Sequence, residues 1–136
     1  MGRISKRKTA GVQTEQNVKV RRYRAGIYAR LSAGHDERKN ESVEVQIEIA
    51  RKYVEEFNLK NTEEIIDIID CYTDLGKTGS NFERESFLRL LQDIRLGEIN
   101  CVIVKDLSRF GRNYLEAGNY IEKIFPFLGL RFIAVA

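Results

Sequence analysis

Short apolar stretches alternate with longer amphipathic stretches through most of this chain. Residues 25–31 are short and apolar with a glycine near their start, which is typical of a buried strand. The β-branched stretch 65–72, the apolar run 101–104 and the final residues 131–136 predict three further strands. The gaps between these strands are long enough for a helix in each.

Apolar side chains recur at helical spacing in all three intervening stretches. The first runs from Ser42, whose hydroxyl suits an N-cap, to residue 57, and the second runs from residue 82 to Gly97. The third runs from about residue 108 towards residue 125, and we expect Pro126 and Gly129 to end it. The predicted order of elements is therefore β-α-β-α-β-α-β.

This order predicts an α/β fold of three layers. A mainly parallel sheet of about four strands would carry helices on both faces, in a doubly wound, flavodoxin-like arrangement. The 136 residues, 43% hydrophobic and 32% charged, suit one compact globular domain, which we place at residues 25–136. Because the pattern stops in or just after a strand, we expect the chain to be cut from a longer protein.

Residues 1–24 form a basic segment ahead of this domain. They hold eight Lys and Arg against a single acid, Glu15, whereas the whole chain has a formal net charge of +3. A basic arm of this kind suits a polyanion such as DNA. It equally suits a solvated, disordered tail, so charge alone does not decide between the two.

Several classes of protein are excluded. The apolar runs are too short for a transmembrane helix, and the polar first residues lack the apolar core of a secretory signal. Cys71 and Cys101 are too few for a disulfide framework and lack metal-site spacing. We therefore expect reduced thiols in the cytoplasm, with neither a metal nor a cofactor.

Candidate chemistry lies at the end of the first predicted strand. Open α/β sheets bind ligands outside the carboxyl ends of their strands. Alternation along the strand puts Tyr28, Arg30 and Ser32 on one face. A buried arginine needs an anionic partner, so Arg30 marks an anion site at which Ser32 offers a hydroxyl.

A second basic cluster follows the third predicted strand. It begins at Lys105, and Arg109 and Arg112 lie three residues apart, on one side of a helical turn. Guanidinium groups bind phosphate oxygens through paired hydrogen bonds. Three arginines and a hydroxyl at one edge of the sheet therefore predict a phosphate site.

These segments resemble the catalytic domain of serine recombinases, the resolvases and invertases. The resemblance rests on residues 28–32 with 42–46, on residues 73–88 and on residues 105–113. Residues 105–113 and 125–136 are most similar to the large serine recombinases of transposons and integrative elements. The resemblance covers residues 25–136 and implies a resolvase-like fold.

The resemblance also implies a reaction. Ser32 would attack a DNA phosphodiester, giving a 5′-phosphoserine bond and a free 3′-hydroxyl without ATP. Gln46 would orient a phosphate oxygen or a neighbouring side chain. The charge of the pentavalent transition state would be stabilised by the arginines that match those of the family, Arg30, Arg84, Arg109 and Arg112.

The partners implied are double-stranded DNA at specific recombination sites and further copies of the chain, in a homodimer that becomes a tetramer in the synapse. The family places its dimer helix and DNA-binding domains after the position of residue 136, and it integrates or excises mobile elements. Additional DNA contacts are expected from Tyr28, Lys105, Arg21, Arg22 and Arg24. The alternative is a non-catalytic, DNA-associated regulatory or oligomerisation module with the same fold.

Two groups of acids leave questions open. Many resolvases carry Asp where this chain has Ser108, so either Asp106 takes over proton transfer or Ser108 is simply an N-cap. Asp67, Asp70 and Asp74 lie near the second predicted strand, as acids do in a magnesium pocket of the receiver type. Such a pocket would also need acids at the end of the first strand, which instead carries basic and hydroxyl groups.

Overall fold

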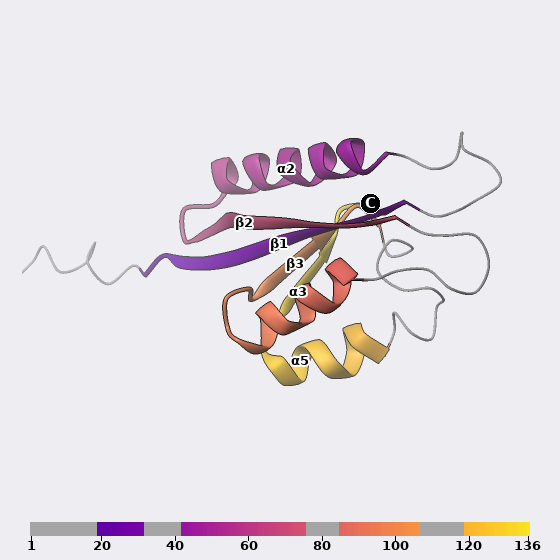
Figure 1. Cartoon of the computed structure of the whole chain (residues 1–136). Helices are drawn as coiled ribbons and strands as arrows, with labels where there is room; N and C mark the ends of the chain where they lie inside the picture. The colour runs from indigo at the N-terminus through magenta and orange to yellow at the C-terminus, as the bar shows by residue number, and fades with distance from the viewer. Residues whose placement is uncertain (1–18, 32–41, 76–84, 107–118) are drawn as a thin grey trace, which may run out of the picture.

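The computed structural model describes residues 19–31, 42–75, 85–106 and 119–136. These residues form a four-stranded sheet with helices against it (Figure 1). The strands are β1 (Arg21–Leu31), β2 (Glu64–Leu75), β3 (Cys101–Val104) and β4 (Arg131–Ala134). All are parallel, in the order β2-β1-β3-β4, so the α/β fold class expected from the sequence is confirmed.

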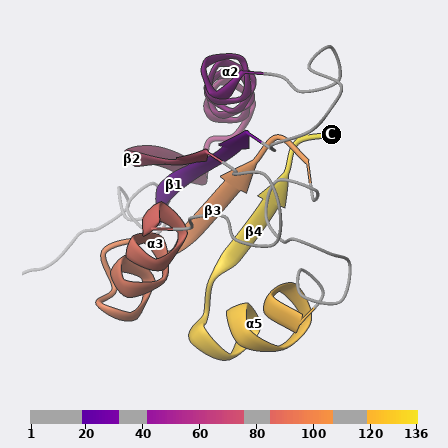
Figure 2. The same cartoon turned by 45° about the vertical axis from the view of Figure 1, so that its right-hand side comes forward.

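Helices cover both faces of the sheet. Helix α2 (Val43–Lys60) lies on one face, and α3 (Glu85–Arg95) and α5 (Phe125–Leu128) lie on the other (Figures 1 and 2). The expected N-cap is present, because the Ser42 hydroxyl accepts the Val45 N–H at 3.2 Å. No helix within the described ranges is both long and apolar enough to cross a bilayer.

The strand order reverses between β1 and β3. The chain goes from β1 to β2 on one side of β1, and then crosses to β3 and β4 on the other side. The carboxyl ends of β1 and β3 therefore flank the switch point at which open α/β sheets bind their ligands. Arg30 and Lys105 lie at these two ends.

A one-residue bulge interrupts β2. Ala25 of β1 is aligned with Ile68 and Gly26 is aligned with Asp70, so Ile69 is the extra residue. Because side chains alternate along a strand, an extra residue reverses the faces of all those that follow. Ile68 thus packs with the core beneath α2, whereas Tyr72 packs with the core beneath α3. The bulge turns the last part of β2 towards α3.

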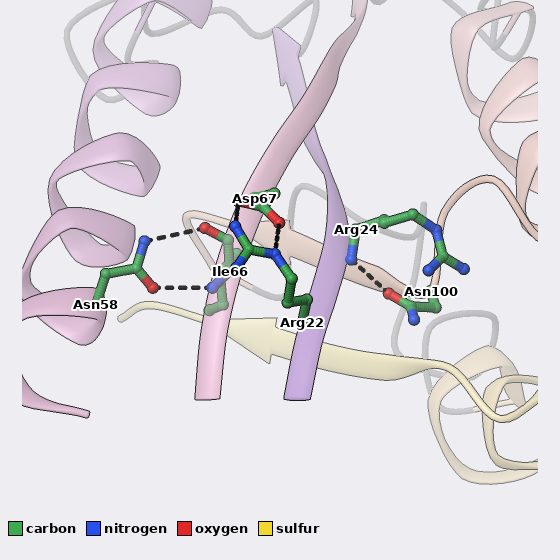
Figure 3. A network of polar contacts seen from close by, with 6 residues as sticks. All are labelled: Arg22, Arg24, Asn58, Ile66, Asp67 and Asn100. Atoms are coloured by element: carbon green, nitrogen blue, oxygen red, sulfur yellow. Dashed lines mark hydrogen bonds and ion pairs between the residues drawn. The ribbon is translucent and has the colours of Figure 1, made fainter. Parts of the chain in front are cut away.

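Strand β1 begins four residues earlier than the predicted strand. Residues 21–24, which the pattern placed in the arm, pair with β2 and belong to the sheet. Figure 3 shows the polar contacts that hold this half of β1: Arg22 binds Asp67 through two nitrogens, at 3.1 and 3.3 Å, and the Arg24 N–H donates to Asn100 at 2.7 Å. The sequence pattern missed this half because its side chains are mostly charged and exposed.

Pro126 does not end the last helix. It lies in the first turn of α5, and the residues before it form a π-helical turn, η3 (Tyr120–Ile124). Proline has no N–H with which to continue the hydrogen bonds of a preceding helix. In the first turn of a new helix the N–H groups have no partner within the helix, so proline is tolerated there. Gly129 ends α5 as expected, with φ 72° and a hydrogen bond from the Leu130 N–H to the Phe125 carbonyl at 2.9 Å.

Replacement of Gly26 by alanine tests the packing of β1 beneath α3. The new Cβ would lie 2.8 Å from Cε1 of Tyr72 and 3.2 Å from Cδ1 of Leu90, in the buried core. The Tyr72 ring cannot yield easily, because its hydroxyl donates to Asp93 at 2.6 Å. We expect Gly26→Ala to lower the free energy of unfolding by about 1–3 kcal/mol in denaturant titrations. Gly26→Ala should cost less stability when Tyr72 is also replaced by leucine, because the clash with the ring is then gone. An equal cost in the presence of Tyr72→Leu would contradict this explanation.

The buried thiol of Cys101 predicts a loss of stability at alkaline pH. Burial raises its pKa from 9.0 to about 12. Between these values the thiol ionises in the unfolded chain but stays protonated in the folded one, so stability falls as pH rises. The slope is at most about 1.4 kcal/mol per pH unit. The free energy of unfolding of wild type should therefore fall more steeply between pH 9 and 12 than that of Cys101→Val, measured in denaturant titrations at several pH values. An equal pH dependence of the two free energies would contradict this prediction.

Candidate active site

Arg30 is buried at the carboxyl end of β1. Its side chain is only 9% exposed, and it lies one residue before the end of the strand. Its Cα is aligned with that of Asp74 on β2, and partners in a parallel pair project from the same face. The structure thus places Arg30 buried at this edge, as its position in the predicted strand indicated, and places the acid Asp74 beside it on β2.

Gln46 holds the main chain of Arg30 from the opposite side of the sheet. Its amide is fully buried: Nε2 donates to the Arg30 carbonyl at 3.0 Å, and Oε1 accepts the Arg30 N–H at 3.2 Å. Strand β3 pairs with β1 only as far as Ile27. The Gln46 amide therefore satisfies the backbone N–H and carbonyl of Arg30, which a longer β3 would otherwise pair with. Its contact in this structure is thus with a neighbouring residue, through main-chain atoms.

Tyr28 and Asp74 connect the two strand ends to α3. The Tyr28 hydroxyl donates to Asp74 Oδ2 at 2.8 Å, and its ring packs edge-on against Phe87 with centroids 5.5 Å apart. Asp74 also accepts the backbone N–H groups of Ser86, at 2.9 Å, and Phe87, at 3.0 Å. Tyr28 was expected to contact DNA, but its side chain is fully buried here and offers no surface to a ligand.

Lys105 and Asp106 follow β3 at the same edge of the sheet. Lys105 Nζ lies 3.3 Å from Asp106 Oδ2, and both side chains are about one quarter exposed, at 23% and 26%. The Lys105 carbonyl accepts the Ala136 N–H at 2.8 Å, which ties this turn to the segment after β4. The acid considered for proton transfer is therefore engaged with a neighbouring cation.

The arginines at the start of β1 lie at the other end of the sheet. Arg22 is paired with Asp67, and the Arg24 guanidinium donates to the carbonyls of Gly97, at 2.7 Å, and Glu98, at 3.3 Å, just after α3. A cation at these carbonyls stabilises the C-terminal end of a helix. Arg24 lies six positions before Arg30, which corresponds to about 20 Å along the strand. Arg22 and Arg24 thus hold structural elements together, and Arg21 is exposed beside them.

The structure brings together part of the predicted site. Arg30, Gln46 and Tyr28 meet at the end of β1, and Lys105 lies at the same edge. The other predicted residues lie outside the described ranges: Ser32, Arg84, Ser108, Arg109 and Arg112.

The role of Asp74 was missed by the sequence prediction. No side-chain pattern signals this role, because two of its partners are backbone N–H groups, those of Ser86 and Phe87. The other acids of β2 have cationic partners, Arg22 for Asp67 and Arg89 for Asp70. Among the described residues, no group of three potential ligands lies close enough together to hold a metal ion.

Solved structures of recombinase domains resemble this chain. The N-terminal catalytic domain of TP901-1 integrase has a TM-score of 0.65 and 28% identity, over 82% of this chain and 76% of that one. A resolvase family site-specific recombinase from Streptococcus pneumoniae has a TM-score of 0.64 and 26% identity, over 83% and 72%. The C-terminal catalytic domain of ISC1926 TnpA, an IS607-like serine recombinase, has a TM-score of 0.62 and 26% identity, over 83% and 67%.

No curated protein matches the chain. The family model of the resolvase N-terminal domain, in contrast, matches residues 25–136. The matched part contains all the described elements except the first residues of β1, and it includes both strand ends that flank the switch point. Since the match spans far more than half of the sequence, this chain belongs to the resolvase N-terminal domain family.

Proposed function

We propose that this chain is the catalytic domain of a serine site-specific recombinase, which cuts and rejoins DNA through a 5′-phosphoserine intermediate. The observation that carries the proposal is the buried Arg30, held by Gln46 at the switch point, two residues before Ser32 in the sequence. Membership of the resolvase family supports site-specific recombination, and the likeness to solved recombinase catalytic domains supports it independently.

The proposed reaction is a phosphoryl transfer in two reversible halves. The Ser32 oxygen forms a bond to phosphorus while the bond from phosphorus to the 3′-oxygen breaks. The hydroxyl proton leaves Ser32, and the departing 3′-oxygen takes up a proton to become a free hydroxyl. Attack by a 3′-hydroxyl on the phosphoserine reverses these changes. The energy of the original bond is kept in the covalent intermediate, so no nucleotide is consumed.

Arginines would stabilise the charge of the transition state. Strand pairing and the two hydrogen bonds from Gln46 fix the main chain of Arg30, so the point from which its side chain extends is already in place when it meets a phosphate. Arg84, Arg109 and Arg112 complete this set by their match to the family pattern. Lys105 adds a cation at the same edge, shared with Asp106.

We infer that the substrate is double-stranded DNA at specific sites, cut by a dimer that pairs into a tetramer, for integration or excision of an element. The chain would act on DNA in the cytoplasm, together with a dimer helix and DNA-binding domains beyond residue 136. Arg22 and Arg24 already have partners within the domain. DNA contacts of the basic arm would therefore come from Arg21 and from the cations before residue 20.

Replacement of the nucleophile and of its neighbouring arginine tests the proposed reaction. The full-length protein, incubated with DNA carrying its recombination site, should form a covalent protein–DNA adduct that is visible after denaturing electrophoresis. Ser32→Ala should abolish the adduct, because no oxygen remains to form the phosphoester. Arg30→Ala should slow adduct formation roughly 100-fold or more, because one donor to the transition state is lost.

Arg24→Ala is the matched control, since Arg24 lies on the same strand but at the other end. It should leave the rate of adduct formation close to that of wild type, measured on protein that is folded by circular dichroism. An adduct that persists in Ser32→Ala, or an equal loss of rate in Arg24→Ala and Arg30→Ala, would contradict the proposed function.

Gln46 and Asn58 provide a test that separates catalysis from folding. Asn58 holds the main chain of Ile66 through both of its amide atoms, at 2.8 and 3.0 Å, much as Gln46 holds Arg30 (Figure 3). Gln46→Met and Asn58→Leu keep the shapes of the side chains but remove these bonds. Both should lower the free energy of unfolding, by about 1–3 kcal/mol for each buried group left unpaired.

Only Gln46→Met should also slow adduct formation, because only Gln46 positions an active-site residue. Unfolding in denaturant and the rate of adduct formation are measured on the same preparations. If the two variants lose rate in proportion to their loss of stability, Gln46 has no special part in the reaction.

A further inference from the structure

Exposed apolar side chains gather on the face of the sheet that carries α3 and α5. Phe127 is 88% exposed, Leu128 is 39% exposed, and Leu88 is 63% exposed, one helical turn before the half-buried Leu91. A single exposed leucine is common on protein surfaces. Apolar side chains that gather on two neighbouring elements are instead typical of an interaction site.

The fold itself turns Phe127 away from the core. Phe125 is buried, and its ring stacks on that of Phe132 with centroids 5.9 Å apart. Residues two positions apart lie on nearly opposite sides of a helix, so the burial of Phe125 directs Phe127 outwards. Pro126 and Gly129 fix the start and the end of this short helix. The exposure of Phe127 therefore follows from the backbone and not from loose packing.

A groove of about 340 Å³ lies between α3 and the segment formed by η3 and α5. The two walls run side by side in both views of the molecule (Figures 1 and 2). Leu91 and Ile124 are half-buried and pack against the core, so they form the floor. The remaining lining residues are Arg95, Lys123, Phe127 and Leu128. The volume lies at the lower end of those that bind ligands, and it suits a few inserted side chains.

The rim of this groove is positive. Among the described residues that line it, Arg95 and Lys123 are cations and none is an acid. Both cations are exposed. Arg95 ends α3, where a cation is favourable, so it is stable there without an acid beside it. An occupant with acidic side chains next to an apolar stripe would match both the rim and the floor.

We propose that the groove between α3 and α5 docks an amphipathic helix of another protein, one that carries acidic residues beside its apolar stripe. Helices that bind in grooves insert apolar side chains at a spacing of three or four residues. These side chains would pack on Leu91, Ile124 and Phe127, while the acids would pair with Arg95 and Lys123. The proposal is independent of the proposed reaction, because α3 ends and β4 begins beside this groove, away from the carboxyl edge of the sheet.

Three other occupants match the groove less well. Residues 1–24 hold eight cations against one acid, so the arm has the same sign as the rim. A second copy related by a twofold axis would present the same positive rim to this one. A bilayer surface is flat, so it would leave the concave floor unfilled.

Binding of two fluorescent peptides to the full-length protein tests the proposal. One peptide is an amphipathic helix of about 18 residues, with leucines along one face and glutamates beside them. The other has the same leucines and has lysine in place of each glutamate. We expect fluorescence anisotropy to show that the acidic peptide binds roughly 10-fold more tightly than the basic one, or better. Equal affinities, or no binding of the acidic peptide, would overturn the proposal.

Substitutions of exposed residues locate the binding site without disturbing the core. Phe127→Ser should weaken binding of the acidic peptide roughly 10-fold or more, because aromatic side chains carry much of the energy of an interface. Arg95→Glu with Lys123→Glu should reverse the preference, so that the basic peptide binds more tightly. Leu59→Ser is the matched control, since Leu59 is 82% exposed on α2, on the other face of the sheet. Equal losses of affinity in Leu59→Ser and Phe127→Ser would overturn the proposal.

Two further measurements test the other occupants of the groove. Self-association in sedimentation equilibrium that Phe127→Ser abolishes would assign the groove to a second copy of the chain and overturn the proposal. Flotation with phosphatidylglycerol vesicles that Phe127→Ser abolishes would assign it to a membrane surface, with the same consequence. We expect Phe127→Ser to change neither measurement.

Discussion

The single extra residue of β2 determines which side chains can meet at the carboxyl edge of the sheet. Without the bulge at Ile69, the alternation of the strand would direct Asp74 towards α2. With the bulge, Asp74 lies on the face of Tyr28 and receives the first amides of α3. The packing of α3, the environment of Tyr28 and the neighbour of Arg30 all depend on this shift of one position.

The site is held by main-chain contacts more than by contacts between functional groups. Gln46 binds the peptide groups of Arg30, and Asp74 binds those of Ser86 and Phe87. Both side chains are buried, so their bonds are protected from competition with water. Such contacts fix where the backbone runs at the ends of β1 and β2.

The order of elements and the parallel sheet could be predicted because buried residues follow regular periods. The bulge could not, since residues 65–69 are almost uniformly apolar and the register is set by pairing with β1. The start of β1 was hidden for the opposite reason: Arg22 and Arg24 are exposed, and their partners come from distant segments. For the site, the position of Arg30 followed from strand alternation, whereas Asp74 binds amides, which leave no trace in side-chain patterns.

The Gln46 amide holds the main chain of Arg30, so this contact serves the fold at this position without specifying the side chain. The amide recognises peptide atoms that every residue type possesses, so this contact does not depend on the guanidinium. A substitution at position 30 would therefore leave both of these hydrogen bonds in place. Through this contact, the course of the main chain and the identity of the side chain that it presents can change separately.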